Sequence, residues 1–258
     1  MEEVRETLVF RLACGTNTGR VREHNEDNFN FFGEGMPLEH QSLERVLTKT
    51  IENGEPFAVA VFDGMGGEQA GELASFTASY AFSRQRDRKN FSAEGITTLF
   101  RSMNAAVCAR KEEGHYSAIG TTVTMIAGEN NVCFVANLGD SPAYLLRNGS
   151  LERISKEHTE REMLQKLGIT NRKPGLTQFL GIDEEQFALT PHIKAFEVLK
   201  GDVILLASDG LTDMVDETVI SNVLSVEKTP ERAVSGLQEL ALANGGVDNI
   251  TIIVCRVE

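Results

Sequence analysis

The chain has 258 residues, of which 41% are hydrophobic, and its formal net charge is -13. A chain of this length buries roughly 70–75% of its unfolded surface, so we expect a substantial core. The acidic balance, without a run of Lys or Arg, argues against binding to nucleic acid or to an anionic membrane. No apolar segment approaches the length of a membrane span and the acidic N-terminus does not resemble a signal peptide, which favours a cytoplasmic location.

Apolar runs rich in β-branched and aromatic residues predict a series of strands. In chain order they are Thr7–Gly15, Asn28–Gly33, Pro56–Asp63, Thr121–Gly128, Asn131–Leu138, Ser141–Arg147, Ala195–Leu199, Asp202–Ser208 and Asn249–Val257. The segments Glu129-Asn130 and Arg147-Asn148-Gly149 are typical of hairpin turns. Hairpins imply antiparallel sheets.

Apolar residues at spacings of three and four predict helices between these strands. Two apolar faces are formed by Leu73, Phe76, Thr77 and Tyr80, and by Ile96, Leu99, Phe100, Met103 and Val107. A third helix is expected to begin at Thr229-Pro230, where an N-cap precedes a proline in the first turn, and to end at Gly245-Gly246. Its buried side would be formed by Leu237, Leu240 and Ala241.

Several hairpins together with separate long helices indicate an α+β fold, in which two packed antiparallel sheets are flanked by helices. The chain contains no Pro-rich or Ser-rich linker and no repeat, so we expect one domain over residues 1–258. Leu43, Val46, Leu47 and Ile51 have the spacing of a short amphipathic helix that decorates the surface.

The four cysteines form no CxxC pair, and each lies in an apolar or helical context. We therefore expect Cys14, Cys108, Cys133 and Cys255 to be buried free thiols. Cys14 and Cys255 fall in the first and last predicted strands and could be neighbours, but no disulfide is predicted.

Three aspartates lie at the ends of apolar runs, beside Gly or Asn. Asp63 and Asp209 each follow such a run, and Asp248 precedes the last one. Strands place side chains rigidly at their ends, so these carboxylates could share one site. Two carboxylates about 4 Å apart repel by roughly 4 kcal/mol at an effective dielectric near 20, so the site would take up protons or a cation. Oxygen ligands select Mg²⁺, Mn²⁺ or Ca²⁺. Each Asp alone could instead form a turn or cap a helix.

These acids belong to motifs that follow one another in a definite order. The motifs are Arg22-(x)₂-Asn25-Glu26-Asp27, Asp63-Gly64-Met65-Gly66-Gly67, Gly120-Thr121-Thr122, Asn137-Leu138-Gly139-Asp140-Ser141, Ser208-Asp209-Gly210-Leu211-Thr212-Asp213 and Asp248-Asn249. Single elements are common, but the ordered set is specific and extends from about Val9 to Val257. It resembles a metal-dependent Ser/Thr protein phosphatase of the PPM type, also called type 2C, and the DGMGG spelling resembles the bacterial branch.

The resemblance implies a four-layer α-β-β-α sandwich with two central antiparallel sheets. It also implies two adjacent Mn²⁺ or Mg²⁺ ions and hydrolysis of phosphoserine or phosphothreonine in proteins by a water activated between the ions. The partners would then be phosphoprotein substrates, and the opposing enzymes would be Ser/Thr kinases. Nothing in the sequence demands more than a monomer, and the lack of a phosphate-loop Cys signature argues against a cysteine phosphatase.

The resemblance also assigns the metal ligands by position. Asp63 would bridge both ions, and the Gly64 carbonyl would ligate one of them. Asp209 and Asp248 would ligate the other ion. Asp27 would reach the metals directly or through bound waters.

Other residues would serve these ligands or the substrate. Glu26, like Asp27, would reach the metal ions directly or through bound waters. Arg22 matches the family's phosphate-binding arginine, whose planar fork suits phosphate oxygens. Asp213 and Asn249 would support the ligands without touching the metals.

The sequence departs from the family pattern in the group that protonates the leaving oxygen. Met65 stands two residues after Asp63, where the animal branch has a His, so no general acid is assigned. His24 and His158 are the nearest histidines to the motifs, and we expect both to be structural or surface residues.

Two further features concern the surroundings of the site. Many family members carry an Asp just before the motif at 120–122 that helps to hold a third metal. No carboxylate stands there in this chain, so a third ion would rely on Asp209 and water. Asp140 is expected to brace its loop. Residues 156–181, which include the loop-like segment Ile169–Gly175, correspond to the flap beside the cleft and are expected to influence substrate choice.

Two alternatives of a different kind stay open. The substrate could be a small phosphorylated metabolite, which turnover of metabolites against phosphopeptides would reveal. The chain could instead be a non-catalytic scaffold, but such a relative should have lost metal ligands, and all of the acids assigned above are present. A nuclease is disfavoured because no basic groove is evident.

Overall fold

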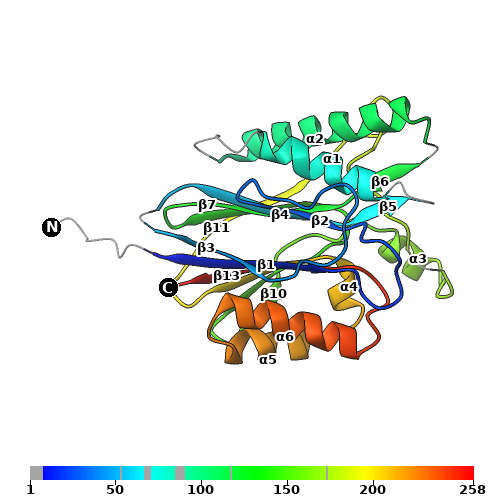
Figure 1. Cartoon of the computed structure of the whole chain (residues 1–258). Helices are drawn as coiled ribbons and strands as arrows, with labels where there is room; N and C mark the ends of the chain where they lie inside the picture. The colour runs from blue at the N-terminus through cyan, green and yellow to red at the C-terminus, as the bar shows by residue number, and fades with distance from the viewer. Residues whose placement is uncertain (1–7, 53, 67–70, 85–90, 117, 173) are drawn as a thin grey trace.

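The computed structural model describes residues 8–52, 54–66, 71–84, 91–116, 118–172 and 174–258. Two antiparallel sheets lie face to face, with helices over the outer face of each (Figure 1). These four layers confirm the expected α-β-β-α sandwich. Thr7 of the first predicted strand and Gly67 of the DGMGG motif lie outside the described residues.

The two large sheets are built as follows. The first contains, in spatial order, β10 (Ser150–Arg153), β9 (Ala143–Arg147), β12 (Val203–Ala207), β13 (Ile250–Val257), β1 (Phe10–Asn17) and β3 (Leu47–Ile51). The second contains β11 (His192–Glu197), β8 (Val132–Leu138), β7 (Val123–Glu129), β4 (Phe57–Phe62) and β2 (Asn28–Phe31). A short pair, β5 (Gly64–Gly66) and β6 (Ile119–Thr121), extends one end of the sandwich.

The helices form the outer layers. The second sheet is covered by α1 (Gly71–Ser83) and α2 (Ala93–Glu113), and the first by α4 (Asp209–Thr212), α5 (Glu217–Val226) and α6 (Pro230–Ala243). The short helix α3 (Arg161–Lys166) lies at the same end of the molecule as β5 and β6 (Figure 1).

Hydrophobic side chains fill three layers, one between the sheets and one beneath each set of outer helices. Strand β13 shows the arrangement: Ile253 and Cys255 face the opposite sheet, whereas Ile252 and Val254 pack under the helices. Because both faces of the sheet are covered, the middle of the strand, Ile252–Cys255, is continuously apolar rather than alternating. This continuity is why most strands could be predicted from the sequence.

The two longest helices agree with the sequence prediction. The predicted apolar face of α2 is buried, and Ser92 caps its start by accepting a hydrogen bond from the N–H of Gly95. Helix α6 begins at Pro230, and Thr229 accepts from the N–H of Arg232 as its N-cap. The four cysteines are free, as expected, and Cys108 alone is partly exposed.

The predicted amphipathic helix around Leu43–Ile51 is wrong. Residues Leu47–Ile51 form β3, which pairs with β1 at the edge of the first sheet. Only Ile51 is buried, and Lys49 between Thr48 and Thr50 is exposed. A charged segment with β-branched residues suits an edge strand. Four apolar residues at helical spacing are too few to override this preference for a strand.

The predicted apolar face of α1 is wrong in part, although Thr77 is buried and Leu73 packs against the core. Tyr80 is 56% exposed, while Ala74, Ser75 and Ala78 are buried. Small residues let α1 approach the β-sheet and α2 closely, and of its large side chains Phe82 is buried.

The segment predicted as a single strand over Thr121–Gly128 is two strands. Its first residue, Thr121, is the last residue of β6, and the chain then changes partner and continues as β7 from Val123. Strand β10 and the helices α3, α4 and α5 had no counterpart in the sequence prediction. Among the described residues, none of the helices has the length and apolar character needed to cross a membrane.

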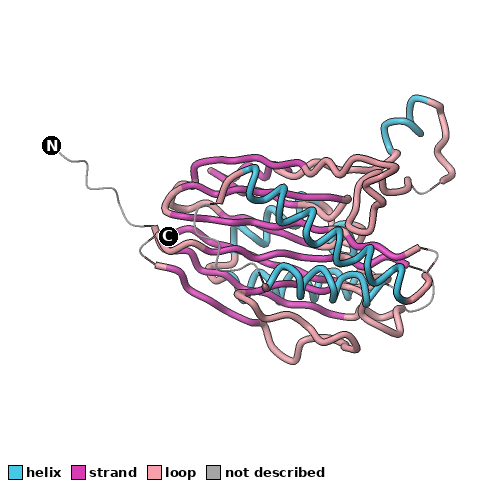
Figure 2. Tube along the Cα trace, turned by 90° about the horizontal axis from the view of Figure 1, so that it is seen from above, coloured by secondary structure: helices cyan, strands magenta, loops and turns pink. Residues whose placement is uncertain are grey.

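The flap segment, residues 156–181, leaves the sandwich at the end that carries β5 and β6. Seen from above, the short helix α3 and its loop project beyond the strands (Figure 2). An isolated bridge joins Thr159 to Leu176, and another joins Leu180 to Thr121. The loop predicted over Ile169–Gly175 is present in its described residues.

His158 fixes the start of the flap segment. It is only 7% exposed, its N–H donates to the Gly139 carbonyl at 3.0 Å, and its Nδ1 accepts from the N–H of Gly139 at 3.3 Å. Burial, assisted by the charges of Lys156 and His192, lowers the pKa of His158 to about 4. The residue is thus structural, as expected.

His158 should make the stability of the protein depend on pH. The unfolded chain titrates this group near 6.5 and the folded chain near 4, so the unfolded state binds more protons between these values and stability falls as the pH drops through them. The loss is at most about 3 kcal/mol and is complete below the folded pKa. Denaturant unfolding at pH 7 and pH 4.5 should show a smaller loss for His158→Asn, which keeps an acceptor for Gly139. Equal losses would contradict this role.

Candidate active site and metal centre

The predicted acids come together at one end of the sandwich, where β5 and α4 begin (Figure 1). Asp27 precedes β2 and Asp63 follows β4, so both belong to the second sheet. Asp209 follows β12 and Asp248 precedes β13, so both belong to the first. The site therefore lies across the junction of the two sheets.

Asp27 is the most buried of these acids, at 2% exposure. The hydroxyl of Ser208 donates to its Oδ2 at 2.7 Å, which joins the two sheets through side chains. Burial raises the pKa of Asp27 to about 7, the hydrogen bonds from Ser208 and Thr251 oppose this, and the charges of Asp209 and Asp248 add to it.

The backbone on both sides of Asp63 is held by two threonines. The N–H of Asp63 donates to Thr122 Oγ1 at 3.1 Å, and its carbonyl accepts from the Thr122 N–H and the Thr121 hydroxyl, both at 2.9 Å. Burial raises the pKa of Asp63 well above its ordinary value, and the charges of Asp209, Asp27, Asp140 and Asp248 raise it further.

These shifts test whether a cation would fit. Among the described residues, no three His, Cys, Asp or Glu side chains converge tightly enough to define an ion position by distance alone. The carboxylates of Asp27, Asp63, Asp209 and Asp248 nevertheless lie close enough to raise the pKa values of the first two. These four carboxylates offer only oxygen donors, and their mutual repulsion opposes ionisation. A hard divalent cation would fit among them, because its charge would remove that repulsion.

Glu26 and Gly64 complete the border of this cluster. Burial and the charge of Glu72 raise the pKa of Glu26, while Arg22 and a hydrogen bond from the backbone of Gly71 lower it. A Cβ on Gly64 would lie 2.3 Å from the carbonyl oxygens of Glu26 and Gly71, so only glycine fits at this close approach.

Asn249 organises the loop that carries Glu26. Its Oδ1 accepts from the N–H of Glu26 at 2.8 Å, and its Nδ2 donates to the carbonyls of Thr18 and His24 at 2.8 and 3.0 Å. The neighbouring Asp248 caps this unit by accepting from the N–H of Asn249 at 2.9 Å. Asn249 thus holds the first acidic motif against the last one.

Arg22 lies at the exposed border of the acids. Its Nη2 donates to Asp248 Oδ2 at 2.8 Å, and 47% of its side chain is exposed. Burial lowers its pKa, but the contact with Asp248 and the charges of Glu26 and Asp63 outweigh that effect and raise it. A guanidinium group has five N–H donors, so this pairing is compatible with binding an anion from solvent.

The remaining candidates are Asp213, Asp140 and His24. Asp213 is exposed at the end of α4, and its charge acts on Arg161 of α3. Asp140 lies in the loop after β8, where its carbonyl accepts from Arg153 at 2.8 Å, and its charge raises the pKa of Asp63. His24 is exposed.

Sequence reasoning missed several residues that support the acids. Ser208 and Asn25 belong to the quoted motifs but received no role, although Asn25 accepts from the N–H of Asp27 and donates to Thr16 Oγ1. His40 hydrogen-bonds the Asp27 carbonyl at 2.8 Å. Ser208 was signalled by its place before Asp209, whereas His40 comes from an irregular segment and carried no signal.

The family model of protein phosphatase 2C matches residues 23–164, more than half of the chain. The chain belongs to the protein phosphatase 2C family. The matched region holds the motifs that contain Asp27, Asp63 and Asp140, and it ends within α3.

Named members of the protein phosphatase 2C family and solved structures are similar over most of this chain. The serine/threonine protein phosphatase PstP of Mycobacterium tuberculosis is 32% identical, over 98% of this chain and 46% of PstP, so the chain spans about half the length of that relative. The serine/threonine phosphatase Stp of Listeria monocytogenes is 29% identical over 92% of each chain. A solved structure of the PstP catalytic domain in complex with two manganese ions has a TM-score of 0.76 and 30% identity, covering 97% of this chain and 99% of that one.

Removing the Ser208 hydroxyl should weaken the metal centre. A hydrogen bond to a charged group contributes about 1.5–3 kcal/mol, so Ser208→Ala should lower the affinity for Mn²⁺ by roughly 10- to 100-fold. Calorimetric titration with Mn²⁺ measures this. Ser225→Ala is the control, because that hydroxyl donates to a backbone carbonyl in an exposed helix. Equal affinities for the two variants would show that Ser208 does not support the site.

Proposed function

We propose that this protein removes phosphate from phosphoserine and phosphothreonine residues of other proteins in a reaction that requires divalent metal. The observation that carries the proposal is the meeting of Asp27, Asp63, Asp209 and Asp248 from both sheets at one place. The similarity to PstP and Stp, both named serine/threonine phosphatases, supports the same chemistry.

The proposed ligands are those that the motifs indicate. Asp63 would serve both ions. The Gly64 carbonyl would help to hold one of them, and Asp209 and Asp248 would hold the other. Asp27 and Glu26 would act directly or through water. When bound, two Mn²⁺ or Mg²⁺ ions supply positive charge for an in-line displacement at phosphorus and acidify the attacking water. Both metals accept oxygen ligands, and the manganese in the PstP structure favours Mn²⁺.

The chain's own groups have two tasks in this reaction. Arg22 would bind the phosphate of the substrate through its planar fork while remaining beside Asp248. Asn249 and Ser208 keep the acids in place through the hydrogen bonds described above. Fixed donors and acceptors of this kind lower the barrier because they need no reorganisation during the reaction.

The cysteines are unsuited to act as the nucleophile. Burial raises the pKa even of Cys108, which is partly exposed. Cys14, Cys133 and Cys255 are buried in the layer between the sheets. Burial raises the pKa of Cys133 to about 12 and that of the other two well above the ordinary value. The reactive form of cysteine is the thiolate, so direct attack by water is the mechanism we propose.

We infer the setting of this activity from the same observations. The substrates would be phosphoproteins in a signalling pathway, modified by Ser/Thr kinases, and the protein would act as a cytoplasmic, single-domain monomer. The net charge of -13 supports the absence of nucleic-acid and membrane partners.

Hydrolysis of a phosphothreonine peptide tests the proposal directly. We expect release of phosphate with Mn²⁺, none with EDTA, and a loss of at least about a thousandfold for Asp209→Ala, because removing a metal ligand removes the charge that stabilises the transition state. The control is Asp216→Ala, which removes an exposed carboxylate at the start of α5. It should retain full activity.

Two other results would redirect the proposal. Turnover of small phosphorylated metabolites without turnover of the peptide would establish a metabolite hydrolase. No turnover by folded protein that binds Mn²⁺ would favour a scaffold.

Arg22→Lys separates phosphate binding from support of Asp248. Lysine keeps a positive charge beside that acid but loses the planar fork. We expect kcat/KM for the peptide to fall about tenfold, equivalent to about 1.4 kcal/mol, while the affinity for Mn²⁺ stays the same. Arg20→Lys, on an exposed residue two positions away, is the control. An unchanged kcat/KM would exclude a role of the fork.

A further inference from the structure

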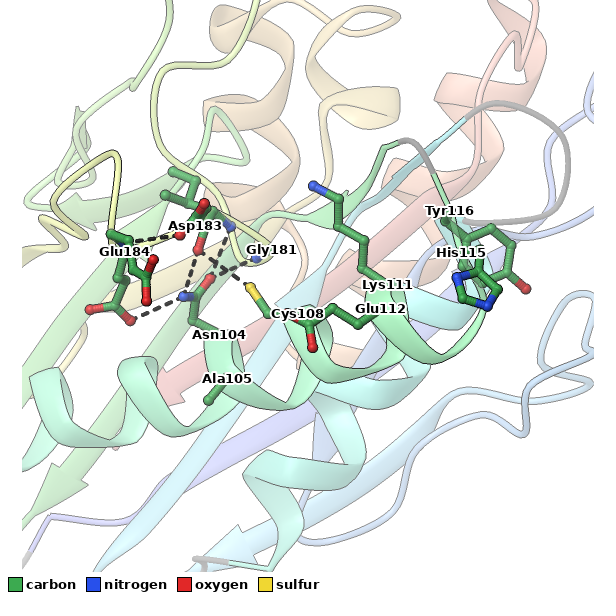
Figure 3. A pocket seen from close by; sticks show the side chains of 12 residues that line it. Asn104, Ala105, Cys108, Lys111, Glu112, His115, Tyr116, Gly181, Asp183 and Glu184 are labelled. Carbon is green, nitrogen blue, oxygen red and sulfur yellow. Dashed lines mark hydrogen bonds between the residues drawn. The ribbon is translucent and has the colours of Figure 1, made fainter.

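A pocket of about 710 Å³ lies between α2 and residues 181–185 (Figure 3). Asn104, which is 2% exposed, points from α2 toward that segment. Its Oδ1 accepts from the N–H groups of Gly181 and Ile182 at 2.7 and 3.1 Å. Its Nδ2 donates to the Ile182 carbonyl at 2.9 Å and to Glu184 at 3.0 Å. One buried side chain therefore holds the backbone at the end of the flap segment.

The residues next to this contact lead directly to the active site. Leu180 exchanges two backbone hydrogen bonds with Thr121, at 2.9 and 3.0 Å, and the Thr121 hydroxyl donates to the Asp63 carbonyl. Gly181 has a φ of +113°, and a Cβ there would lie 2.6 Å from the Ile119 carbonyl oxygen. Residues 180–182 are thus fixed between α2 and β6.

A second buried asparagine holds the other end of the flap segment. Asn137 is fully buried at the end of β8. Its Nδ2 donates to the Lys156 carbonyl at 2.7 Å, and its Oδ1 accepts from the N–H of Lys156 at 3.1 Å. Both backbone groups of Lys156 are satisfied by this one side chain, in the same manner as those of Ile182.

The flap segment runs from Lys156, held by Asn137, to Ile182, held by Asn104, and between these two points it forms a narrow stem that carries α3. The N–H of Thr177 donates to the His158 carbonyl, and that of Glu160 donates to the Gly175 carbonyl, both at 2.9 Å. Beyond the stem, α3 projects from the sandwich (Figure 2). Its Arg161 pairs with Glu157 at 2.7 Å. The position of α3 therefore depends on the stem, and the stem depends on its two ends.

We propose that Asn104 and Asn137 are positioning residues that clamp the flap segment and so give the active site its preference for phosphoproteins over small phosphoesters. This inference rests on the proposed phosphatase function. The physical reason is size. The charges of Asp140 and Asp213 act on Arg161 of α3, which indicates that α3 lies near the site. A small phosphoester would need room only at the acids, whereas the chain on either side of a phosphorylated residue would extend beyond them toward α3. Misplacement of a positioning element by about 1 Å is enough to reduce turnover strongly.

The test compares two substrates in Asn104→Leu, which has a similar volume but cannot hydrogen-bond. We expect KM for a phosphothreonine peptide to rise about tenfold, the size expected when buried hydrogen bonds to an element are lost. With para-nitrophenyl phosphate, kcat and KM should stay within about twofold, because no residue of the carboxylate cluster is changed. Asn137→Leu should also raise KM for the peptide. The free-energy effect of the double variant should be smaller than the sum of the two single effects, since both substitutions release the same flap segment.

Asn30→Leu is the matched control. Asn30 is also 2% exposed, and it donates to the Ser79 carbonyl and accepts from the N–H of Gly33. It makes these bonds away from the flap segment, so the ratio of the two substrates should not change. An equal loss with both substrates in Asn104→Leu, or no loss with either, would overturn the inference while leaving the phosphatase function in place. A wild-type protein inactive on both substrates would overturn both.

Hydrogen exchange in the wild-type protein provides a test that does not depend on a variant. The amides of Gly181, Ile182 and Lys156 should be protected like those of the sheets, because their acceptors are buried asparagine oxygens. Exchange of these amides at the rate of an exposed loop would show that no clamp exists.

Discussion

The repulsion among carboxylates at one end of the sandwich is the constraint on which the site depends. Asp27 and Asp63 belong to the second sheet, and Asp209 and Asp248 to the first, so the layer of side chains between the sheets sets their separation. That layer is built from fully buried groups such as Phe10, and it cannot yield without losing apolar contacts. Burial, and in addition the charges of the neighbouring acids, raise the pKa values of Asp27 and Asp63. Hydrogen bonds across the sheet junction, above all from Ser208, offset part of this rise for Asp27.

Prediction from the sequence was most successful where a short stretch of residues determines its own structure. Continuous apolar runs become strands because both faces of each sheet are covered, and acids that border such runs are placed at strand ends. Asp63 and Asp209 could therefore be assigned to one site from their positions in the sequence alone. Helix α6 was equally clear, because its cap and its first-turn proline act within a few residues. Local signals do not show which distant segments meet in the fold, and the ordered motifs provided this information through the family resemblance.

Prediction failed where the outcome depends on a distant partner. Leu47–Ile51 has a weak helical spacing, and its strand exists because β1 offers an edge at which it can pair. Most of the buried residues of α1 are small, since close packing against neighbouring elements decides which side of the helix turns inward. His40 supports Asp27 from an irregular segment. In each of these cases the deciding contact is made by residues that the local pattern does not contain.

The surroundings of Asp63 show how a rigid cluster of acids can coexist with a projecting flap segment. Three interactions hold its backbone: the strand β4, the hydrogen bonds with Thr122, and the hydroxyl of Thr121. The flap segment joins this system at Thr121, through the bridge to Leu180. Because the other supports belong to the sandwich, a shift of the flap changes the surroundings of the acids more than their positions. A flap of different sequence and shape would therefore leave the acids in place. In the function that we propose, this separation would allow one metal centre to act on different phosphoproteins.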